Sequence, residues 1–345
     1  MKITHIVWSL LTGGIETMLV NIINEQVKSE EVELVIVNNL YYDPLLNKLS
    51  PLCKVRFCKR TPGSKNPWPI IKLNYWLLRF SPDVVHHHSC RTSYLVKGRY
   101  NMVRTIHSTR IYSTEYPRMK ALFSISESVR DDTLKQGCDS IVIENGIPTG
   151  MFKRKEKYID KNDCYHLVQV SRLDVSQKGQ DILIRAINEL VNKRKVTNLH
   201  LHFIGEGDSR TALEKMVSDF NLDGYITFEG VKTQEFLYEH LCDYDCFVQP
   251  SRYEGFGLTV AEAMAAGLPV LVSDIEGPME IIDNGRVGMA FKTEDVSDLA
   301  DKLEIILGGG YDYSMIDNAI ERVRQKYDVS VTAQKYINEY RRILK

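Results

Sequence analysis

The sequence lacks the features that mark disulfide-built, secreted or membrane-spanning proteins. Its seven cysteines are an odd number without a CxxC pair or a zinc-ligand spacing, which is typical of a reducing compartment. No apolar run approaches the ~18 residues that a membrane-spanning helix needs. Residues 1–11 have no small-residue cleavage site, so they predict a strand rather than a signal peptide. We therefore expect a cytoplasmic protein.

A strong excess of charge of one sign is also missing, because the formal net charge is −1. This value hides a division of charge along the chain. Residues 1–150 contain 19 Lys and Arg against 13 Asp and Glu, whereas residues 151–345 contain 25 against 32. Two halves of opposite charge indicate two domains with different tasks. The length of 345 residues predicts the same number of domains, each large enough to bury a core.

Short β-branched apolar runs alternate with longer amphipathic segments in both halves. Strands are predicted at residues 3–8, 32–37, 54–58, 83–87, 103–106, 121–125, 141–143, 166–170, 200–204, 226–228, 245–248 and 270–272. Helices are predicted at residues 15–27, 70–79, 126–135, 180–192, 209–220, 234–242, 259–266 and 296–307, with a last helix at 329–344. This alternation predicts parallel sheets, and hence an α/β protein of two Rossmann-like domains with a helical tail.

Residues 151–163 are almost entirely polar and are interpreted as the linker between the two domains. The domains are accordingly expected at residues 1–155 and 164–328, followed by a C-terminal helix at residues 329–345. Ligands of open parallel sheets bind beyond the carboxyl ends of the strands, where loops lead into helix N-termini. Three such loops carry informative residues.

The first loop contains Gly13 and Gly14, just before a predicted helix. Adjacent glycines permit close approach of the backbone to a phosphate, although a plain strand-to-helix turn explains them equally well. The motif is not GxGxxG, and no suitable acidic residue follows the next strand, so a dinucleotide site is not expected.

The second loop places Arg172 and Lys178 after the first strand of the second half. Two cations at a strand's carboxyl end suit a diphosphate, because Arg offers a planar fork and Lys a point charge. A solvated loop is the alternative interpretation.

The third loop, residues 249–258, leads from a strand into a helix and carries Glu254, Gly255 and Gly257, with Glu262 inside the helix. The glycines allow backbone amides to approach a ligand at the positive end of the helix. Carboxylates there suit hydroxyl-rich groups such as sugars and riboses, because they accept hydrogen bonds from hydroxyls. Glu262 lies in the Ala-rich segment AEAMAAG, where burial of a carboxylate without partners would be costly.

These residues resemble a known family. The segment EGFGLTVAEAMAAGLPV, with Glu254 and Glu262 separated by seven residues, is similar to the E-x7-E signature of glycosyltransferase family 4, retaining enzymes of the GT-B fold. Other matching segments are GGIE at 13–16, IHS at 106–108, NGIP at 145–148, SRL and KG at 171–179, and IGEGDSR at 204–210. The sequence departs from the family pattern at Ser171 and Pro148.

The resemblance implies a role for each matching residue. Arg172 and Lys178 would bind the donor diphosphate, Glu262 the ribose hydroxyls, and Glu254 the hydroxyls of the transferred sugar. Backbone amides of Gly255, Phe256, Gly257 and Leu258 would meet the sugar and phosphates, with Gly13 and Gly14 at the same diphosphate. His107 would face the donor sugar across a cleft between the two domains.

The resemblance further implies an acceptor-binding first domain, a donor-binding second domain and a final helix that packs back on the first. The expected reaction is transfer of a sugar from UDP-hexose or UDP-N-acetylhexosamine to a glycan or lipid-linked acceptor in cell-surface polysaccharide synthesis. Family members are generally metal-independent, so neither a metal nor a cofactor is expected. The alternatives are a nucleotide-sugar epimerase and a non-catalytic nucleotide-sugar-binding protein of the same fold.

Two further segments invite interpretation. The tract His86–His87–His88 ends a strand, where alternation lets at most His86 and His88 point the same way. A contact with the acceptor is preferred there over a metal site, and the other histidines, His5 among them, are predicted to pack structurally. Residues 54–79 combine seven cations with Trp68, Tyr75 and Trp76. They indicate either a helix packed on the core or peripheral contact with the inner face of the membrane, and no nucleic-acid partner.

Overall fold

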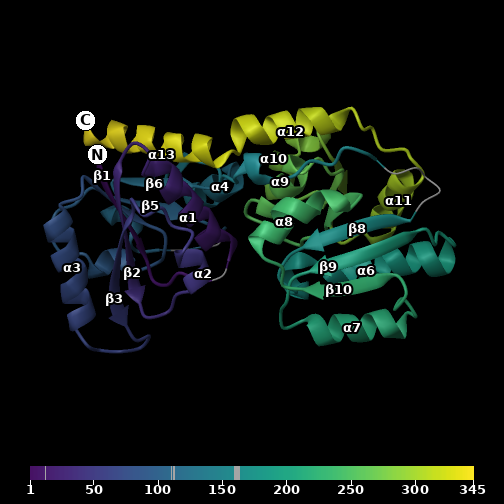
Figure 1. Cartoon of the computed structure of the whole chain (residues 1–345), viewed down its shortest axis with the longest axis horizontal. Helices are drawn as coiled ribbons and strands as arrows, with labels where there is room; N and C mark the ends of the chain where they lie inside the picture. The colour runs from purple at the N-terminus through teal and green to yellow at the C-terminus, as the bar shows by residue number, and fades with distance from the viewer. Residues whose placement is uncertain (12, 110, 112, 159–163) are drawn as a thin grey trace. The chain divides into compact units, whose positions relative to one another are not determined.

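Two parallel sheets with their helices make up the protein (Figure 1). The computed structural model describes residues 1–345 apart from residues 12, 110, 112 and 159–163. The chain divides into one unit of Met1–Pro148 with Lys326–Lys345, and a second unit of Thr149–Gln325. Each unit contains one of the two sheets, as the alternation of strands and helices predicts.

The first unit has a seven-stranded sheet in the order β3-β2-β1-β4-β5-β6-β7. The strands are β1 (Lys2–Val7), β2 (Glu31–Asn38), β3 (Lys54–Arg60), β4 (Val84–His87), β5 (Met102–Ile106), β6 (Ala121–Ser124) and β7 (Ile141–Val142). The helices are α1 (Gly14–Gln26), α2 (Asp43–Leu46), α3 (Trp68–Phe80) and α4 (Glu127–Lys135). On β1, Ile3 packs in a cluster with α1, and Ile6 packs in another with α3. Because neighbouring strand positions alternate between faces, these helices cover opposite faces of the sheet.

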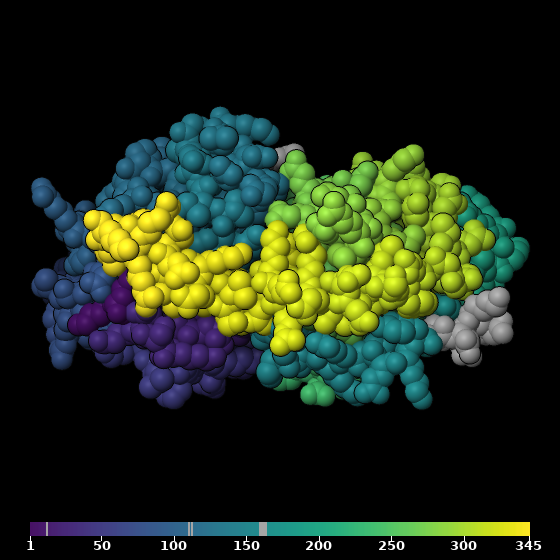
Figure 2. Space-filling model, turned by 90° about the horizontal axis from the view of Figure 1, so that it is seen from above, coloured from purple at the N-terminus to yellow at the C-terminus, as the bar shows by residue number. Residues whose placement is uncertain are grey.

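The last helix, α13 (Val329–Leu344), belongs to the first unit and lies beside α1. Figure 2 shows it as the yellow segment that lies over the purple and blue parts of that unit. Its buried Tyr340 hydroxyl is 2.6 Å from Nδ1 of His86, and the Tyr336 hydroxyl is 2.9 Å from Oγ1 of Thr105. These buried polar contacts fix the position of the helix on strands β4 and β5.

The second unit has a six-stranded sheet in the order β10-β9-β8-β11-β12-β13. The strands are β8 (Tyr165–Val170), β9 (Leu199–Ile204), β10 (Ile226–Gly230), β11 (Cys246–Gln249), β12 (Val270–Ser273) and β13 (Met289–Phe291). The helices are α5 (Val175–Lys178), α6 (Gln180–Asn188), α7 (Arg210–Asp219), α8 (Gln234–His240), α9 (Leu258–Ala265), α10 (Glu276–Ile281), α11 (Val296–Leu307) and α12 (Met315–Lys326). In both sheets the strand order reverses beside the first strand, at β1/β4 and β8/β11, where such folds bind ligands.

The structure differs from the sequence-based expectation in its short elements. Strand β13 and helix α10 were not predicted, because three residues show no alternation and the segment EGPMEI contains Gly and Pro. Helix α6 is shorter than predicted, since residues Glu189–Lys193 form a π-helical turn after it.

The predicted linker is wrong for residues 151–158, which pack on the second unit. The backbone N–H of Lys155 donates to the carbonyl of Ala266 at 2.9 Å, and its ammonium pairs with Asp245 at 2.9 Å. The Tyr158 hydroxyl donates to the carbonyl of Gly267, and Phe152 is buried. The division between the units falls after Pro148, so polar composition misled the prediction. Residues 159–163 of the predicted linker lie outside the described residues.

We predict that Gly146→Ala destabilises the first unit. A Cβ at Gly146 would lie 2.6 Å from Cα of Val329 and 2.6 Å from Oγ1 of Thr332, so the start of α13 would have to shift. Overpacking of this kind costs about 1–3 kcal/mol. Trp8, Trp68 and Trp76 are the only tryptophans of the chain and all belong to this unit, so urea unfolding followed by their fluorescence is the measurement. Gly150→Ala is the control, because nothing lies within 4 Å of its Cβ. Equal midpoints for both variants would contradict the prediction.

Candidate active site

Lys178 and Glu254, 76 residues apart in the sequence, form an ion pair in the second unit. Lys178 is the last residue of α5, and Glu254 lies in the loop between β11 and α9. The Gln249 amide also donates to Oε2 of Glu254, at 3.2 Å. Both side chains of the pair are about one-sixth exposed, at 17% and 16%. The structure thus brings together one of the two predicted diphosphate cations and the predicted sugar-binding carboxylate.

Gly179 allows the loop carrying Glu254 to approach the end of α5. Gly179 has φ +65°, and a Cβ there would collide with the carbonyl oxygen of Pro250. A side chain at this position would therefore be strained by both the conformation and the contact. The close approach places Lys178 opposite the loop at residues 249–258.

Arg252 holds the same two segments together through several hydrogen bonds. Its guanidinium donates to both carboxylate oxygens of Asp181, at 2.8 and 3.0 Å, and to the carbonyl of Val175 at 2.6 Å. Its backbone N–H donates to the carbonyl of Gln177 at 2.8 Å. A bidentate pair between Arg and a carboxylate has a defined geometry. Arg252 therefore fixes α5, and with it Lys178, against the loop.

Arg172 projects into solvent. Its side chain is 65% exposed, and it donates to Asp174 at 3.0 Å and to Gln177 at 3.3 Å. The pairing with Asp174 is a surface interaction that contributes little to stability. Arg172 is therefore free to exchange these partners for an anion.

Glu262 is buried in the middle of α9, as the sequence suggested. Its Oε1 accepts a hydrogen bond from the Gln234 amide on α8 at 3.1 Å. Burial raises the pKa of Glu262 to about 7, against an ordinary value of 4.5, and the bond from Gln234 opposes this only in part. A carboxylate with one hydrogen-bond partner in a buried position can accept further bonds from hydroxyl groups.

The loop before α9 presents its backbone rather than its side chains. Phe256 has its ring buried, so only its main chain could meet a ligand. Gly257 precedes the helix in a left-handed conformation, and α9 begins at Leu258. Gly255 completes this segment between the Lys178–Glu254 pair and the positive end of α9.

In the first unit, Gly13 and Gly14 stand at the start of α1, as predicted. The carboxylate of Glu16 lies beside Gly13, where an added Cβ would collide with it. Burial raises the pKa of Glu16. An acidic side chain next to a helix N-terminus is favourable for the helix dipole.

His107 follows β5, at the carboxyl edge of the first sheet. Both of its ring nitrogens are buried, with no hydrogen-bond partner among the described residues. Burial, together with the nearby Arg104, lowers the pKa of His107 to about 4, so the ring is neutral near pH 7. A neutral imidazole can both donate and accept one hydrogen bond.

The tract His86–His87–His88 alternates as predicted. His87 turns toward Thr92, with Nδ1 and Oγ1 2.9 Å apart. His86 and His88 share the other side with His5 of β1, and one ring nitrogen of each lies within 4.8 Å of the others. Both nitrogens of His86 already contact hydroxyl groups, those of Tyr340 and Thr105. No carboxylate or thiol belongs to this cluster in the described part of the chain.

Comparison with known families gives a consistent result. Residues 12–150 match the family described as Glycosyltransferase Family 4, and residues 164–308 match the one described as Glycosyl transferases group 1. Two doubly wound parallel sheets with these matches define a GT-B glycosyltransferase. The chain belongs to glycosyltransferase family 4, whose members are retaining enzymes that use a nucleotide-sugar donor.

Individual relatives agree with this assignment. An uncharacterized glycosyltransferase of Methanocaldococcus jannaschii is 27% identical over 296 residues, which are 75% of this chain and 75% of the relative. The poly(ribitol-phosphate) alpha-N-acetylglucosaminyltransferase of Staphylococcus aureus is 30% identical over 240 residues, covering 56% of this chain and 48% of the relative. The chain therefore spans about half of the second relative's length.

Solved structures share the fold. A glycosyltransferase from Rickettsia africae superimposes with a TM-score of 0.83 at 19% identity, covering 100% of this chain and 98% of that one. Anabaena HepE, in complex with UDP and glucose, gives a TM-score of 0.81 at 18% identity, covering 98% and 99%.

Sequence reasoning missed two residues of the second unit's site. Arg252 lies two residues before Glu254, in a loop already predicted to carry site residues. Its position in the sequence could therefore have marked it as a further residue of the site. Gln234 gave no signal, because it is a polar residue at the start of a predicted helix. Its role depends on the packing of α8 beside α9, which no local pattern encodes.

We predict that Glu262→Gln stabilises the protein at neutral pH but not near pH 4.5. Between pH 4.5 and about 7 the unfolded chain has lost the Glu262 proton that the folded chain retains, so rising pH destabilises the wild type through this group. Glutamine has no proton to lose. The advantage of the variant should therefore grow from near zero to about 3 kcal/mol above pH 7.

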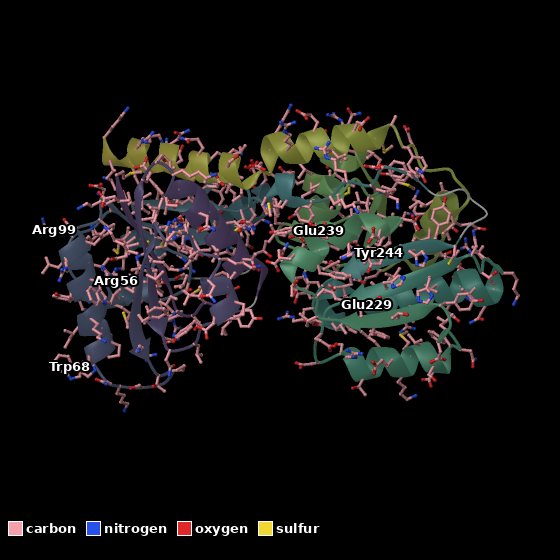
Figure 3. All side chains as sticks on the ribbon, in the orientation of Figure 1. Arg56, Trp68, Arg99, Glu229, Glu239 and Tyr244 are labelled. Carbon is pink, nitrogen blue, oxygen red and sulfur yellow. The ribbon has the colours of Figure 1, made fainter. Side chains whose placement is uncertain are left out.

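Urea unfolding by circular dichroism between pH 5 and 8 measures this difference. The control is Glu239→Gln, which removes an exposed carboxylate from α8 (labelled in Figure 3). A difference between Glu262→Gln and the wild type that does not vary with pH would refute the assignment.

Proposed function

We propose that this glycosyltransferase transfers a hexose or N-acetylhexosamine from a UDP-sugar to a glycan or lipid-linked acceptor in cell-surface polysaccharide synthesis. The second unit binds the donor and the first unit the acceptor. The observation that carries the proposal is the Lys178–Glu254 pair beside the N-terminal end of α9. It combines a cation for a diphosphate with a carboxylate for sugar hydroxyls in one place.

Donor binding exchanges the partners of this pair. The diphosphate takes the Lys178 ammonium and the Arg172 guanidinium, and Glu254 then accepts hydrogen bonds from the sugar. Glu262 accepts from the ribose hydroxyls. Cleavage of the glycosyl–phosphate bond leaves negative charge on the departing diphosphate, and fixed cations and helix-end amides stabilise that charge as it develops. Within the first unit, the proposal assigns substrate contacts to Gly13, Gly14 and His107.

The choice of UDP and of the sugar is supported by the similar proteins, although their names concern those proteins alone. The S. aureus relative is described as an N-acetylglucosaminyltransferase, and the HepE structure contains UDP. A carboxylate at the position of Glu254 suits the uncharged hydroxyls that hexoses and N-acetylhexosamines share.

A panel of nucleotide sugars read by thermal shift tests the donor. A saturating ligand at 100 times its dissociation constant stabilises the folded state by about 2.7 kcal/mol, so a UDP-sugar should raise the midpoint clearly. A shift with a GDP-sugar or ADP-sugar alone would refute the choice of base.

Variants then test the site. Lys178→Ala should lower the rate of sugar transfer about 100-fold or more. The variant lacks the preorganised cation that stabilises negative charge on the departing diphosphate. The matched control is Lys215→Ala, which removes a lysine of α7 that is 72% exposed and pairs with Asp219. Release of UDP only when an acceptor is present excludes an epimerase, and any turnover excludes a non-catalytic module. Near-normal turnover of Lys178→Ala would show that the assigned site is wrong.

We further propose that the first unit docks on an anionic lipid surface through α3. One face of this helix buries Leu73, Leu77 and Phe80. The opposite face exposes Trp68 by 67%, Ile71 by 51%, Tyr75 by 49% and Leu78 by 76%. These positions follow helical spacing and so form one apolar stripe. Figure 3 shows Trp68 at the end of α3, with Arg56 on the neighbouring β3.

The positive charge around the apolar stripe of α3 indicates which kind of surface it contacts. Lys65, Lys72 and Arg79 are exposed around it, and no Asp or Glu occurs from residue 44 to residue 82. Apolar side chains bordered by cations match an interface of acyl chains and anionic headgroups, which is where a lipid-linked acceptor resides. None of the described helices combines the length and apolarity needed to cross a bilayer.

Co-sedimentation with phosphatidylglycerol vesicles tests the docking. Each cation near an anionic surface contributes about 1 kcal/mol, so the double variant Lys65→Gln/Lys72→Gln should bind about 30-fold more weakly. Leu78→Ser should also weaken binding, because it removes apolar contact. Val231→Ser, which changes a 72% exposed residue of the second unit, is the control. Sedimentation that is the same for all variants would contradict the proposal.

A further inference from the structure

Three residues of the first unit form a buried hydrogen-bond chain that the proposed reaction does not use. Nε2 of His5 lies 2.7 Å from Oε1 of Gln26, and Nδ1 of His5 lies 2.9 Å from Nε2 of His88. Gln26 comes from α1, His5 from β1, and His88 follows β4. All three are buried. The chain ends at the carboxyl edge of the sheet, beside its β1/β4 switch point.

The chemistry of the first member determines the direction of every bond. The Gln26 oxygen can only accept, so Nε2 of His5 carries the hydrogen. A neutral imidazole has one N–H, so Nδ1 of His5 must accept, and Nε2 of His88 must donate to it. It follows that Nδ1 of His88 has a lone pair and no hydrogen. This atom is buried and has no partner among the described residues.

The rings are neutral, which this reasoning requires. Burial lowers the pKa of His5 to about 4 and that of His88 well below its ordinary value. The neighbouring rings also disfavour a charge on His88, since His86, His5 and His107 all oppose its protonation.

One neighbouring ring can donate a hydrogen bond to the unpaired Nδ1 of His88. His5 and His86 lie beside it, but both nitrogens of each are already engaged. His107 is the remaining ring, and both of its nitrogens are buried without partners in the described part of the chain. Unpaired buried polar atoms are uncommon, and three of them side by side call for an explanation.

The rings of His88 and His107 are neighbours, although no hydrogen bond joins them in this structure. The centroids of His5 and His88, which are bonded at 2.9 Å, are 5.2 Å apart. The bonded pair His166 and His202 has the same centroid separation, 5.2 Å. The centroids of His88 and His107 are 5.8 Å apart. A hydrogen bond between His88 and His107 therefore requires these rings to turn or to move closer together.

We propose that Gln26, His5 and His88 orient His107 in the working enzyme. His107 donates one N–H to Nδ1 of His88 and keeps its other nitrogen as an acceptor for a hydroxyl group of the bound sugar. The last step rests on the proposed function, whereas the orientation of the rings does not. Gln26, His5 and His88 are positioning residues, and the group that His107 recognises is an uncharged hydroxyl donor.

A metal ion held by His5, His86 and His88 is the competing explanation. Such an ion would have to displace the Gln26, Tyr340 and Thr105 partners of these rings. It would also place a positive charge in a buried position without a carboxylate, which is costly. The existing hydrogen bonds therefore favour the orienting chain.

Nitrogen-15 NMR of the histidine rings in the full-length protein tests the proposal without any substrate. Two-bond proton–nitrogen correlations show which ring nitrogen carries the hydrogen, and single His→Gln variants assign the signals. We expect His5 and His88 as neutral Nε2–H tautomers near pH 7, unchanged by EDTA. A hydrogen on Nδ1 of His88, a doubly protonated ring, or a change on adding EDTA would each overturn the proposal.

Variants of Gln26, the member of the hydrogen-bond chain that is farthest from His107, provide the second test. Gln26→Leu removes the acceptor that orders the chain, so His5 and His88 should lose their single tautomers although Gln26 does not contact His88. Ile23→Val removes a methyl group from another buried residue of α1, one that takes no part in the Gln26–His5–His88 hydrogen bonds. It should change no tautomer. Tautomers unaffected by Gln26→Leu would refute the relay.

Enzyme kinetics is the third test, with a nucleotide sugar that the thermal-shift panel identifies as a ligand. His88→Leu should lower kcat/KM by about 10- to 100-fold through misplacement of His107, and His88→Asn, which retains an acceptor near the Nδ1 position, should restore most of it. Equal losses in the two variants would overturn the orienting role. If no donor is found, the proposed function fails while the tautomers still decide this inference.

Discussion

The second unit depends on the close approach of Gly179 to the carbonyl of Pro250. Because no side chain intervenes, the end of α5 and the loop before α9 come near enough for Arg252 to bridge them and for Lys178 to pair with Glu254. Both side chains of the pair are about one-sixth exposed, so the pair remains in contact with solvent. In the proposed function the diphosphate would take Lys178 and the sugar would take Glu254, two side chains that neutralise each other in this structure.

Several buried titratable groups near the carboxyl edges of the two sheets favour their uncharged forms. Glu262 in the second unit and the histidines of the first have pKa values displaced toward the uncharged form, because burial penalises charge. Uncharged acceptors and donors suit hydroxyl groups, whereas cations such as the exposed Arg172 and the largely buried Lys178 suit phosphates.

The sequence predicted the long elements well and the connections poorly. Strand β2 is a β-branched apolar run and helix α13 is amphipathic, and the structure confirms both near the predicted bounds. Residues 151–158 were predicted as a linker because they are polar, yet Lys155 is fixed by its pairing with Asp245. The E-x7-E spacing identified Glu254 and Glu262, and their partners Lys178 and Gln234 come from other segments. Only Lys178 of these two carried its own signal, in the loop after β8.

By itself, the sequence determined the class of fold, the family and the positions of the charged loops, because periodicity and motif spacing are properties of neighbouring residues. The tertiary structure decided which groups are paired, which are buried and which histidine nitrogens have no hydrogen-bond partner among the described residues. His5 shows the difference: it looked like a packing residue of a strand, and it lies between Gln26 and His88 in a chain that ends beside His107. Such contacts join residues that are distant in sequence, so folding alone creates them.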